Sequence, residues 1–164
     1  MPLVSEIVLV YKVEQYIERC VRSLMEQTFD DIEFIFVNDC TPDKSMDILR
    51  RVIEDYPART PQIRIIENEV NRGAAASRNI GLDAATGDYI IFTDSDDWIE
   101  PTMVADMYNV AINECSDIVW CGVNGMRGES QGHTPDNYIR ALLARRITPI
   151  PTNKLVSKYL YNQF

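Results

Sequence analysis

The chain has 164 residues, of which 46% are apolar, so it is long enough for one domain with a substantial hydrophobic core. Its 25 acidic and 16 basic side chains give a formal net charge of −9, which argues against a surface that binds nucleic acid or another polyanion. No apolar run approaches the roughly 18 residues of a membrane span, and the N-terminus has no basic stretch followed by an apolar one. We therefore expect a cytoplasmic protein without a transmembrane segment in this chain.

Short apolar runs alternate along the chain with helical periodicities. In order, the pattern predicts a strand over Glu6–Tyr11, a helix over Glu14–Gln27, a strand over Glu33–Asn38, a helix between Thr41 and Pro57, a strand over Ile63–Ile66, a helix over Ala74–Ala85, a strand over Tyr89–Thr93, a helix from Glu100 and a strand over Asp117–Val123. This alternation indicates βαβ units with right-handed crossovers. The predicted fold is α/β and doubly wound, with a mostly parallel sheet and helices on both faces.

Local signals refine two of these helices. Thr41 is predicted to cap the second helix, and Gly87 to stop the third. In the Ala-rich third helix, Ala76, Ile80 and Ala84 share one face. Small side chains there let the helix lie close to its neighbours, although helix propensity explains the alanines equally well.

The character of the chain changes after Val123. A polar loop is expected over Asn124–Asp136, and a helix over Tyr138–Ile147. The last segment, Thr152–Phe164, has no clear stop signal. We treat residues 1–164 as a single domain, with a core over 1–123 and a second region over 124–164.

Three acidic residues, Asp94, Asp96 and Asp97, directly follow the predicted buried strand Tyr89–Thr93. In extended backbone Asp94 and Asp96 point the same way, and two carboxylates held together favour either a raised pKa or a divalent cation. Mg²⁺ or Mn²⁺ is commonly held by one or two carboxylates plus substrate phosphates. The alternative is a solvated acidic loop that caps the next helix.

In an open parallel sheet, ligands bind outside the carboxyl ends of the strands. Val10 and Tyr11 lie at the first of these ends, Asp39 at the second, and Asp94 with Asp96 at the fourth. The chain has no Gly-x-Gly-x-x-Gly after the first strand and no Gly-x-x-x-x-Gly-Lys-Ser/Thr, which argues against a dehydrogenase or a P-loop enzyme.

The cysteines give no sign of a zinc site. They form no Cys-x-x-Cys pair, and His133 is the sole histidine in the sequence. We expect reduced thiols at all four positions, which are Cys20, Cys40, Cys115 and Cys121.

Four motifs occur in the order found in the N-terminal half of a family 2 glycosyltransferase with the GT-A fold, which this chain resembles. They are Val-Tyr-Lys-Val-Glu-Gln-Tyr-Ile-Glu-Arg-Cys (10–20), Val-Asn-Asp-Cys-Thr-Pro-Asp-Lys-Ser (37–45), Asn-Arg-Gly-Ala-Ala-Ala-Ser-Arg-Asn-Ile-Gly (71–81) and Gly-Asp-Tyr-Ile-Ile-Phe-Thr-Asp-Ser-Asp-Asp-Trp (87–98). Asn153-Lys154-Leu155 also resembles a later segment of such enzymes. The resemblance implies a nucleotide-sugar-binding core over 1–123 and the incomplete start of an acceptor-side region over 124–164.

The resemblance also implies roles for individual residues. Asp39 would accept a hydrogen bond from the imide of uracil, and Arg78 would approach the phosphates. Asp94 would lie near the ribose and the metal, and Asp96 would be the principal ligand of Mn²⁺ or Mg²⁺. The remaining residues expected to line the nucleotide-sugar pocket are Val10, Tyr11, Glu14 and Ser95. The reaction would be metal-dependent transfer, with inversion, from a UDP-sugar to a hydroxyl of a glycan or a lipid carrier, which could place the protein at the inner face of the membrane.

The chain departs from this family pattern in three places. Leu9 and Lys12 replace a proline and an asparagine that the first motif often has, and Cys40 replaces the glycine of an Asp-Gly-Ser-Thr motif. The acid that acts as general base is expected beyond Phe164, which suggests a truncated enzyme; Asp136 is better explained as a helix cap. A non-catalytic nucleotide-sugar-binding or interaction domain is therefore the alternative function. A receiver-type signalling domain fits less well, because the first strand ends in Tyr11 rather than in acids.

Overall fold

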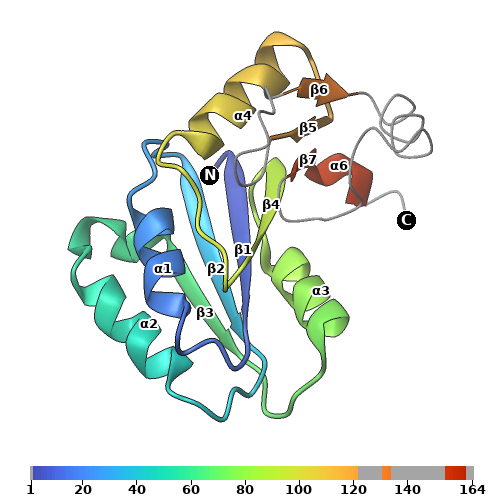
Figure 1. Cartoon of the computed structure of the whole chain (residues 1–164). Coiled ribbons are helices and arrows are strands. Elements are labelled where there is room, and N and C mark those ends of the chain that lie inside the picture. The colour runs from blue at the N-terminus through green and yellow to red at the C-terminus, as the bar shows by residue number, and fades with distance from the viewer. Residues whose placement is uncertain (1, 122–130, 134–153, 162–164) are drawn as a thin grey trace.

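The computed structural model describes residues 2–121, 131–133 and 154–161 (Figure 1). The strands are β1 (Val4–Val10), β2 (Ile32–Asn38), β3 (Ile63–Glu67), β4 (Tyr89–Asp94), β5 (Ile118–Trp120), β6 (Gln131–His133) and β7 (Lys154–Ser157). The helices are α1 (Ile17–Met25), α2 (Ser45–Glu54), the 3₁₀ helix η1 (Pro57–Gln62), α3 (Ala74–Ala84), α4 (Met103–Asn113) and α6 (Lys158–Tyr161). The predicted helix over Tyr138–Ile147 lies outside the described residues.

These strands form one sheet in the order β3-β2-β1-β4-β7-β5-β6. The pairs β1/β2, β1/β4 and β2/β3 are parallel, whereas β7 is antiparallel to both β4 and β5, and β6 is antiparallel to β5. The predicted α/β fold is confirmed: β1 to β4 form the parallel part of the sheet, and the antiparallel pairs of β5, β6 and β7 make the whole sheet mixed. The sequence did not predict β7, which lies between the predicted strands β4 and β5.

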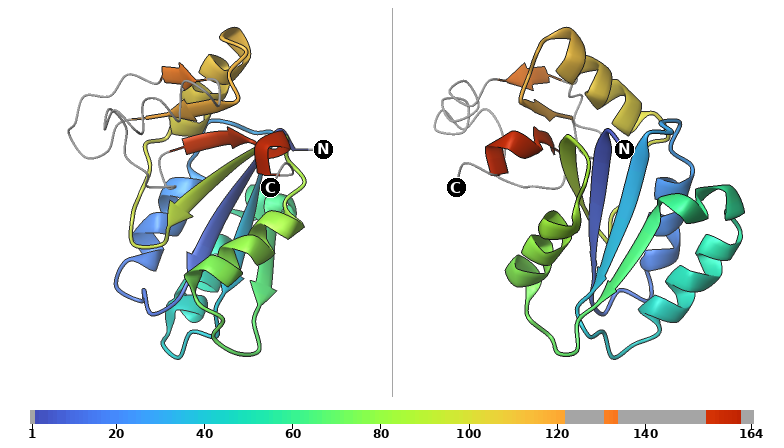
Figure 2. Two further views of the ribbon diagram at one scale, coloured as in Figure 1. Left: turned by 90° about the vertical axis from the view of Figure 1, so that its right-hand side faces the viewer. Right: turned by 180° about the vertical axis from the view of Figure 1, so that it is seen from behind.

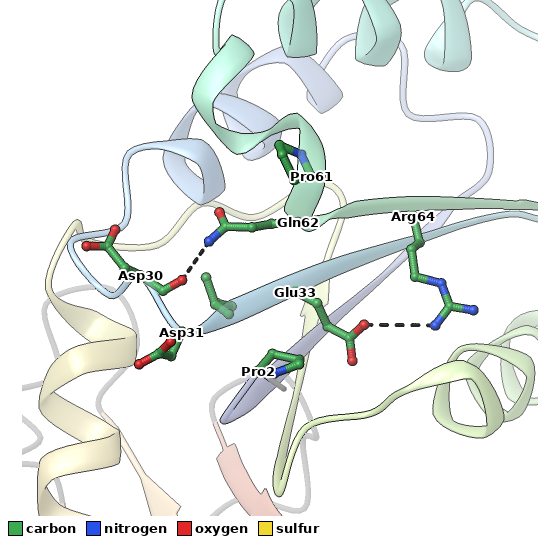
Figure 3. A pocket seen from close by; sticks show the side chains of 8 residues that line it. Pro2, Asp30, Asp31, Glu33, Pro61, Gln62 and Arg64 are labelled. Carbon is green, nitrogen blue, oxygen red and sulfur yellow. Dashed lines mark hydrogen bonds and ion pairs between the residues drawn. The ribbon is translucent and has the colours of Figure 1, made fainter.

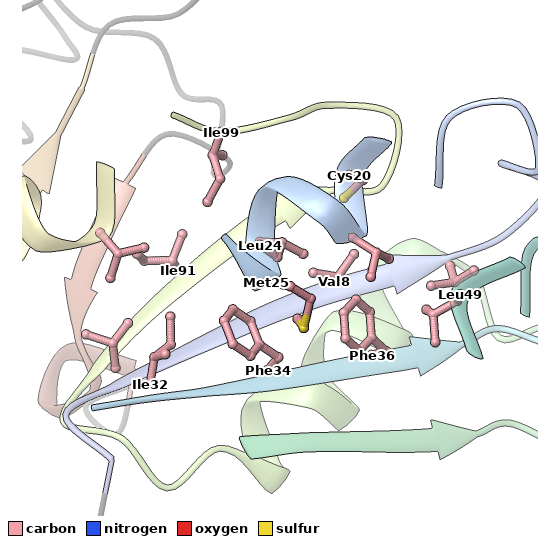
Figure 4. Close-up of a cluster of buried hydrophobic side chains, with 14 of the residues drawn as sticks. Val8, Cys20, Leu24, Met25, Ile32, Phe34, Phe36, Leu49, Ile91 and Ile99 are labelled. Atoms are coloured by element: carbon pink, nitrogen blue, oxygen red, sulfur yellow. The ribbon is translucent and has the colours of Figure 1, made fainter. Parts of the chain in front are cut away.

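Side chains along each strand point alternately to the two faces of the sheet, and helices cover both faces (Figure 2). One face of β1, with Val4, Val8 and Val10, packs in a large apolar cluster with residues of α1, α2 and α4 (Figure 4). The other face, with Ile7, packs with Ile80 and Ala84 of α3. Among the described helices, none has the length and apolar character needed to cross a bilayer.

The face that α3 buries is shifted from the predicted one. Ala76 is exposed, and the fully buried positions are Ser77 and Gly81. A Cβ atom at Gly81 would lie 2.4 Å from Cγ2 of Ile7, so the absence of a side chain allows α3 to approach β1. A small residue thus does let α3 lie close to the sheet, but that residue is Gly81 and not the predicted Ala76.

Two predicted helix signals are wrong. The second helix begins at Ser45 rather than after Thr41, because the Thr41 hydroxyl donates to Oδ1 of Asp43 (2.8 Å) and accepts the backbone N–H of Lys12 (2.7 Å). Helix α3 ends at Ala84, so Gly87 does not cap it. Gly87 lies instead against β1, where a Cβ atom would come within 2.7 Å of the Ser5 nitrogen.

The chain passes from β1 through β2 to β3 and then returns to β4 on the opposite side of β1. Such a reversal of strand order leaves an opening at the carboxyl ends of the two strands where the connections diverge. These ends lie in the lower half of Figure 1, on the side of the sheet where α3 starts. The candidate site is therefore built from the loops after β1, β2 and β4.

Candidate functional site at the carboxyl ends of the strands

The end of β1 brings the first predicted pair, Val10 and Tyr11, to the edge of the sheet. Val10 is buried, and its carbonyl accepts the backbone N–H of Asp39 (3.1 Å), which ties the ends of β1 and β2 together. The Tyr11 side chain is 37% exposed, and the ammonium group of Lys12 lies 5.3 Å from the centre of its ring. Tyr11 is therefore partly open to solvent at this edge of the sheet.

Asp39 is only 2% exposed and holds the segment that leads into α3. Its Oδ1 accepts the backbone N–H of Arg72 (2.8 Å) and Nδ2 of Asn68 (3.0 Å), and its Oδ2 accepts the N–H of Gly73 (2.9 Å). Burial alone would raise the pKa of Asp39, but these hydrogen bonds and the Ser77 hydroxyl outweigh it and lower the pKa. Asp39 is therefore ionised and fixed before any ligand binds.

Glu14 belongs to a contact between the loop after β1 and the loop after β2. Its carboxylate accepts the backbone N–H of Lys44 (3.2 Å), and its own N–H donates to Oδ2 of Asp43 (3.2 Å). Asp43 also accepts the Ser45 hydroxyl (2.6 Å). Sequence reasoning missed Asp43, although an aspartate just before a helix that begins with serine is a frequent loop-stabilising pattern.

The loops after β1 and β2 share a strained backbone conformation. Lys12 has φ 54° and Cys40 has φ 55°, both in the left-handed region that non-glycine residues adopt at a cost. Hydrogen bonds from Lys12 N to Thr41 Oγ1 (2.7 Å) and from Thr41 N to Asn38 Oδ1 (2.9 Å) help to hold this path. The backbone at the edge of the site is thus fixed by contacts between the two loops.

The acidic loop after β4 faces the first turns of α3. Asp94 forms an ion pair with Arg78, with Nη2 2.8 Å from Oδ1. Ser95 is buried and Asp96 is exposed, and the backbone turns back through a bond from Asp97 N to Asp94 O (3.0 Å). The predicted alternative, an acidic loop that only caps the next helix, does not describe Asp94, because α4 begins at Met103.

The acids after β4 have the chemistry that a divalent cation requires, although they do not by themselves supply a full set of ligands. Asp94 and Asp96 offer carboxylate oxygens, which Mg²⁺ and Mn²⁺ prefer. Burial and then the charges of Asp96 and Asp94 raise the pKa of Asp97, and a cation would relieve this repulsion. Within residues 2–121, 131–133 and 154–161, no group of three or more His, Cys, Asp or Glu side chains is placed to hold a metal ion by itself. A cation here would depend on oxygen atoms from a bound molecule.

Behind the site, buried polar side chains lie inside the sheet. Glu6 in β1 is fully buried and accepts a hydrogen bond from the Thr93 hydroxyl, next to Asp94. Lys154 of β7 is also buried, and burial lowers its pKa to about 8. Cys20 of α1 lies with its Sγ 3.8 Å from the Asp94 carbonyl, and burial, followed by the charge of Glu6, raises the pKa of its thiol. Burial thus disfavours the thiolate form of Cys20.

A separate hollow of about 310 Å³ lies at the opposite, amino ends of β2 and β3 (Figure 3). In its wall Nη1 of Arg64 lies 3.9 Å from Oε2 of Glu33, and the side-chain amide of Gln62 donates to the backbone carbonyl of Asp30 (2.6 Å). The hollow shares no residue with the loops after β1, β2 and β4. The predicted site residues therefore converge elsewhere, at the carboxyl ends.

Comparisons with known proteins point to one family. Residues 5–158 match the family model described as Glycosyl transferase family 2. EpsJ of Bacillus subtilis (strain 168), an uncharacterized glycosyltransferase, is 42% identical over 135 residues, which are 82% of this chain and 38% of EpsJ. EpsH of the same strain, which also carries the name of a glycosyltransferase, is 39% identical over 167 residues, 94% of this chain and 46% of EpsH.

The fold is also shared with a solved structure. The crystal structure of S. aureus TarS 1–349 in complex with UDP is 26% identical and superimposes with a TM-score of 0.75, covering 99% of this chain and 48% of that one. The chain thus spans less than half the length of these relatives.

Proposed function

Because the chain belongs to glycosyl transferase family 2, we propose that it carries the donor site of a glycosyltransferase, which binds a UDP-sugar where the predicted site residues meet. The sugar would pass, with inversion, to a hydroxyl group of a glycan or a lipid-linked carrier. The likeness to TarS, solved with UDP, supports the choice of nucleotide. Since the chain spans less than half the length of these relatives, we propose that other parts of the enzyme bind the acceptor and supply the general base.

One observation carries this proposal: a basic and an acidic group meet in an open ion pair, Arg78 with Asp94, beside the exposed carboxylate of Asp96. A nucleoside diphosphate with its cation needs both kinds of group, a guanidinium for phosphate oxygens and carboxylates for the metal. When bound, the cation would neutralise the charge that develops on the departing diphosphate.

The other site residues would bind the nucleoside. Tyr11 offers an exposed ring to the base. The Asp39 carboxylate has about four lone-pair sites, and it already accepts hydrogen bonds from Asn68, from the backbone of residues 72 and 73 and from the Ser77 hydroxyl. The imide of uracil would therefore bind Asp39 by replacing one of these donors. We assign Glu14 and Val10 to shaping this pocket through the two loops, and Ser95 to the turn that presents Asp96.

Calorimetric titration of UDP into the purified chain tests the proposal, first with Mn²⁺ and then with a chelator. We expect binding in Mn²⁺ that is lost with the chelator and in Asp96→Asn. The matched control is Asp88→Asn, an exposed acid at the other end of β4, which should bind UDP as the wild type does. UDP binding that ignores the chelator would contradict the metal role, and absence of binding in both conditions would contradict the donor site.

A further inference from the structure

The ion pair between Arg78 and Asp94 joins two residues that the proposed function gives to different ligands. Nη2 of Arg78 lies 2.8 Å from Oδ1 of Asp94, and the side chains are 31% and 37% exposed. The pair is therefore held by the protein and still open to an incoming molecule. If Arg78 binds phosphate and Asp94 binds metal, a metal-bound donor would compete with this contact for both side chains.

The charge around the pair makes the guanidinium hard to replace by a metal alone. Asp94, Asp96 and Asp97 lie within four residues, and Arg78 is the one basic side chain in the described part of the chain that forms an ion pair with any of them. A divalent ion that reaches Asp94 first would have to approach this guanidinium or displace it. Either route costs electrostatic free energy, because both groups are positive.

A diphosphate changes this balance because it offers oxygen atoms to both cations. The planar guanidinium of arginine matches phosphate oxygens with two parallel hydrogen bonds, a geometry that its present contact with Asp94 through one Nη2–Oδ1 pair does not use. Once Arg78 turns to the phosphate, both oxygens of Asp94 can serve the metal. Binding of the nucleotide then frees Asp94 for the metal.

We propose that Arg78 is a positioning residue that couples nucleotide binding to metal binding, by occupying Asp94 until a diphosphate arrives. The inference rests on the proposed function. Couplings between two ligands of one protein typically amount to about 5- to 150-fold in affinity, and they are reciprocal. UDP should therefore tighten Mn²⁺ binding by such a factor, and Mn²⁺ should tighten UDP binding equally.

The test measures Mn²⁺ affinity, from the electron paramagnetic resonance of free Mn²⁺, with and without UDP. In Arg78→Gln we expect tighter Mn²⁺ binding than in the wild type when UDP is absent, and a smaller gain when UDP is added. Arg78→Lys should keep the weak binding of Mn²⁺ alone, since the charge remains. Arg51→Gln is the matched control, because Arg51 of α2 forms an ion pair of 3.0 Å with Glu18, outside the site.

Each result separates the two proposals. Metal-dependent UDP binding by the wild type, together with an unchanged or weaker Mn²⁺ affinity in Arg78→Gln, would overturn the coupling and leave the donor site intact. Failure of the wild type to bind UDP with Mn²⁺ would overturn both. A purely structural role of Arg78 predicts weaker binding of both ligands in the variant, so a gain in Mn²⁺ affinity cannot come from loss of structure.

Discussion

The carboxyl group of Glu6 lies in the middle of β1 with 0% exposure. Oε1 accepts a hydrogen bond from the Thr93 hydroxyl of β4, whereas Oε2 is buried without a hydrogen-bond partner in the described part of the chain. Burial, offset in part by the Thr93 hydrogen bond, raises the pKa of Glu6 from 4.5 to about 7. The ionised form is therefore costly in the folded sheet.

The size of this cost follows from the pKa. A rise from 4.5 to about 7 corresponds to about 3 kcal/mol, at about 1.4 kcal/mol per pH unit. Below pH 4.5 the carboxyl group is protonated in both states and the cost is absent. Between pH 4.5 and 7 the unfolded chain releases a proton that the folded chain keeps, so the free energy of unfolding falls as the pH rises. Above pH 7 the loss stays constant.

The perturbation is Glu6→Gln, which removes this titration. Urea unfolding, followed by the fluorescence of Trp98 and Trp120, would give the free energy of unfolding of both proteins at several pH values from about 4 to 8. We expect the stability of the variant relative to the wild type to rise by about 3 kcal/mol across this range, with most of the change between pH 4.5 and 7. Parallel curves for the two proteins would refute the reasoning, because they would show that Glu6 ionises as easily in the folded as in the unfolded state.

The remaining predictions concern three other positions. Burial would raise the pKa of Glu33, but hydrogen bonds from Ser5 and Thr86 outweigh burial and lower the pKa. Glu33→Gln should therefore destabilise the protein by about 1 to 3 kcal/mol at pH 7, and progressively less as the pH falls below 4.5. Midpoints of urea unfolding at several pH values check this. Gly81→Ala should lower the free energy of unfolding by about 1 to 3 kcal/mol, measured by thermal unfolding, because the new Cβ would collide with Ile7. Asn79→Ala, at an exposed position of the same helix, should cause no loss of stability. Cys40→Gly should be more stable than Cys40→Ala by about 1 kcal/mol in urea, since the alanine keeps the Cβ that opposes φ 55°; equal midpoints would contradict this.

The fold could be predicted where the signal is local. Apolar runs gave β1 to β5, and helical spacing with Pro57 gave the course of α1 and α2. Strand β7 could not be found in this way, because it has four residues and begins with Lys154, whose side chain is buried only through long-range pairing with β4 and β5. For a similar reason the first strand was predicted to begin at Glu6, although β1 begins at Val4: a charged residue ends an apolar run in sequence, but the sheet encloses it.

The site could be predicted as a set of positions, but not as a set of contacts. Strand ends and motif spacing brought Tyr11, Asp39 and Asp94 to one edge of the sheet, as expected. The sequence could not show that Asp39 already binds the backbone of residues 72 and 73, because these residues lie 33 and 34 positions further along the chain. Nor could it show that Asp94 and Arg78 neutralise each other, since their pairing depends on how α3 lies against β4.

The strained residues Lys12 and Cys40 show how local preference and long-range contacts compete in this site. Both stand where the sequence departs from the family motifs, which often have asparagine and glycine, the residues that adopt positive φ most easily. The backbone follows the left-handed path all the same, at about 1 to 2 kcal/mol for each residue. The hydrogen bonds between the loops therefore hold the path against the preferences of residues 12 and 40. Because the path also sets where Tyr11 and Asp39 lie, relieving the strain by Cys40→Gly should raise stability and leave UDP affinity unchanged.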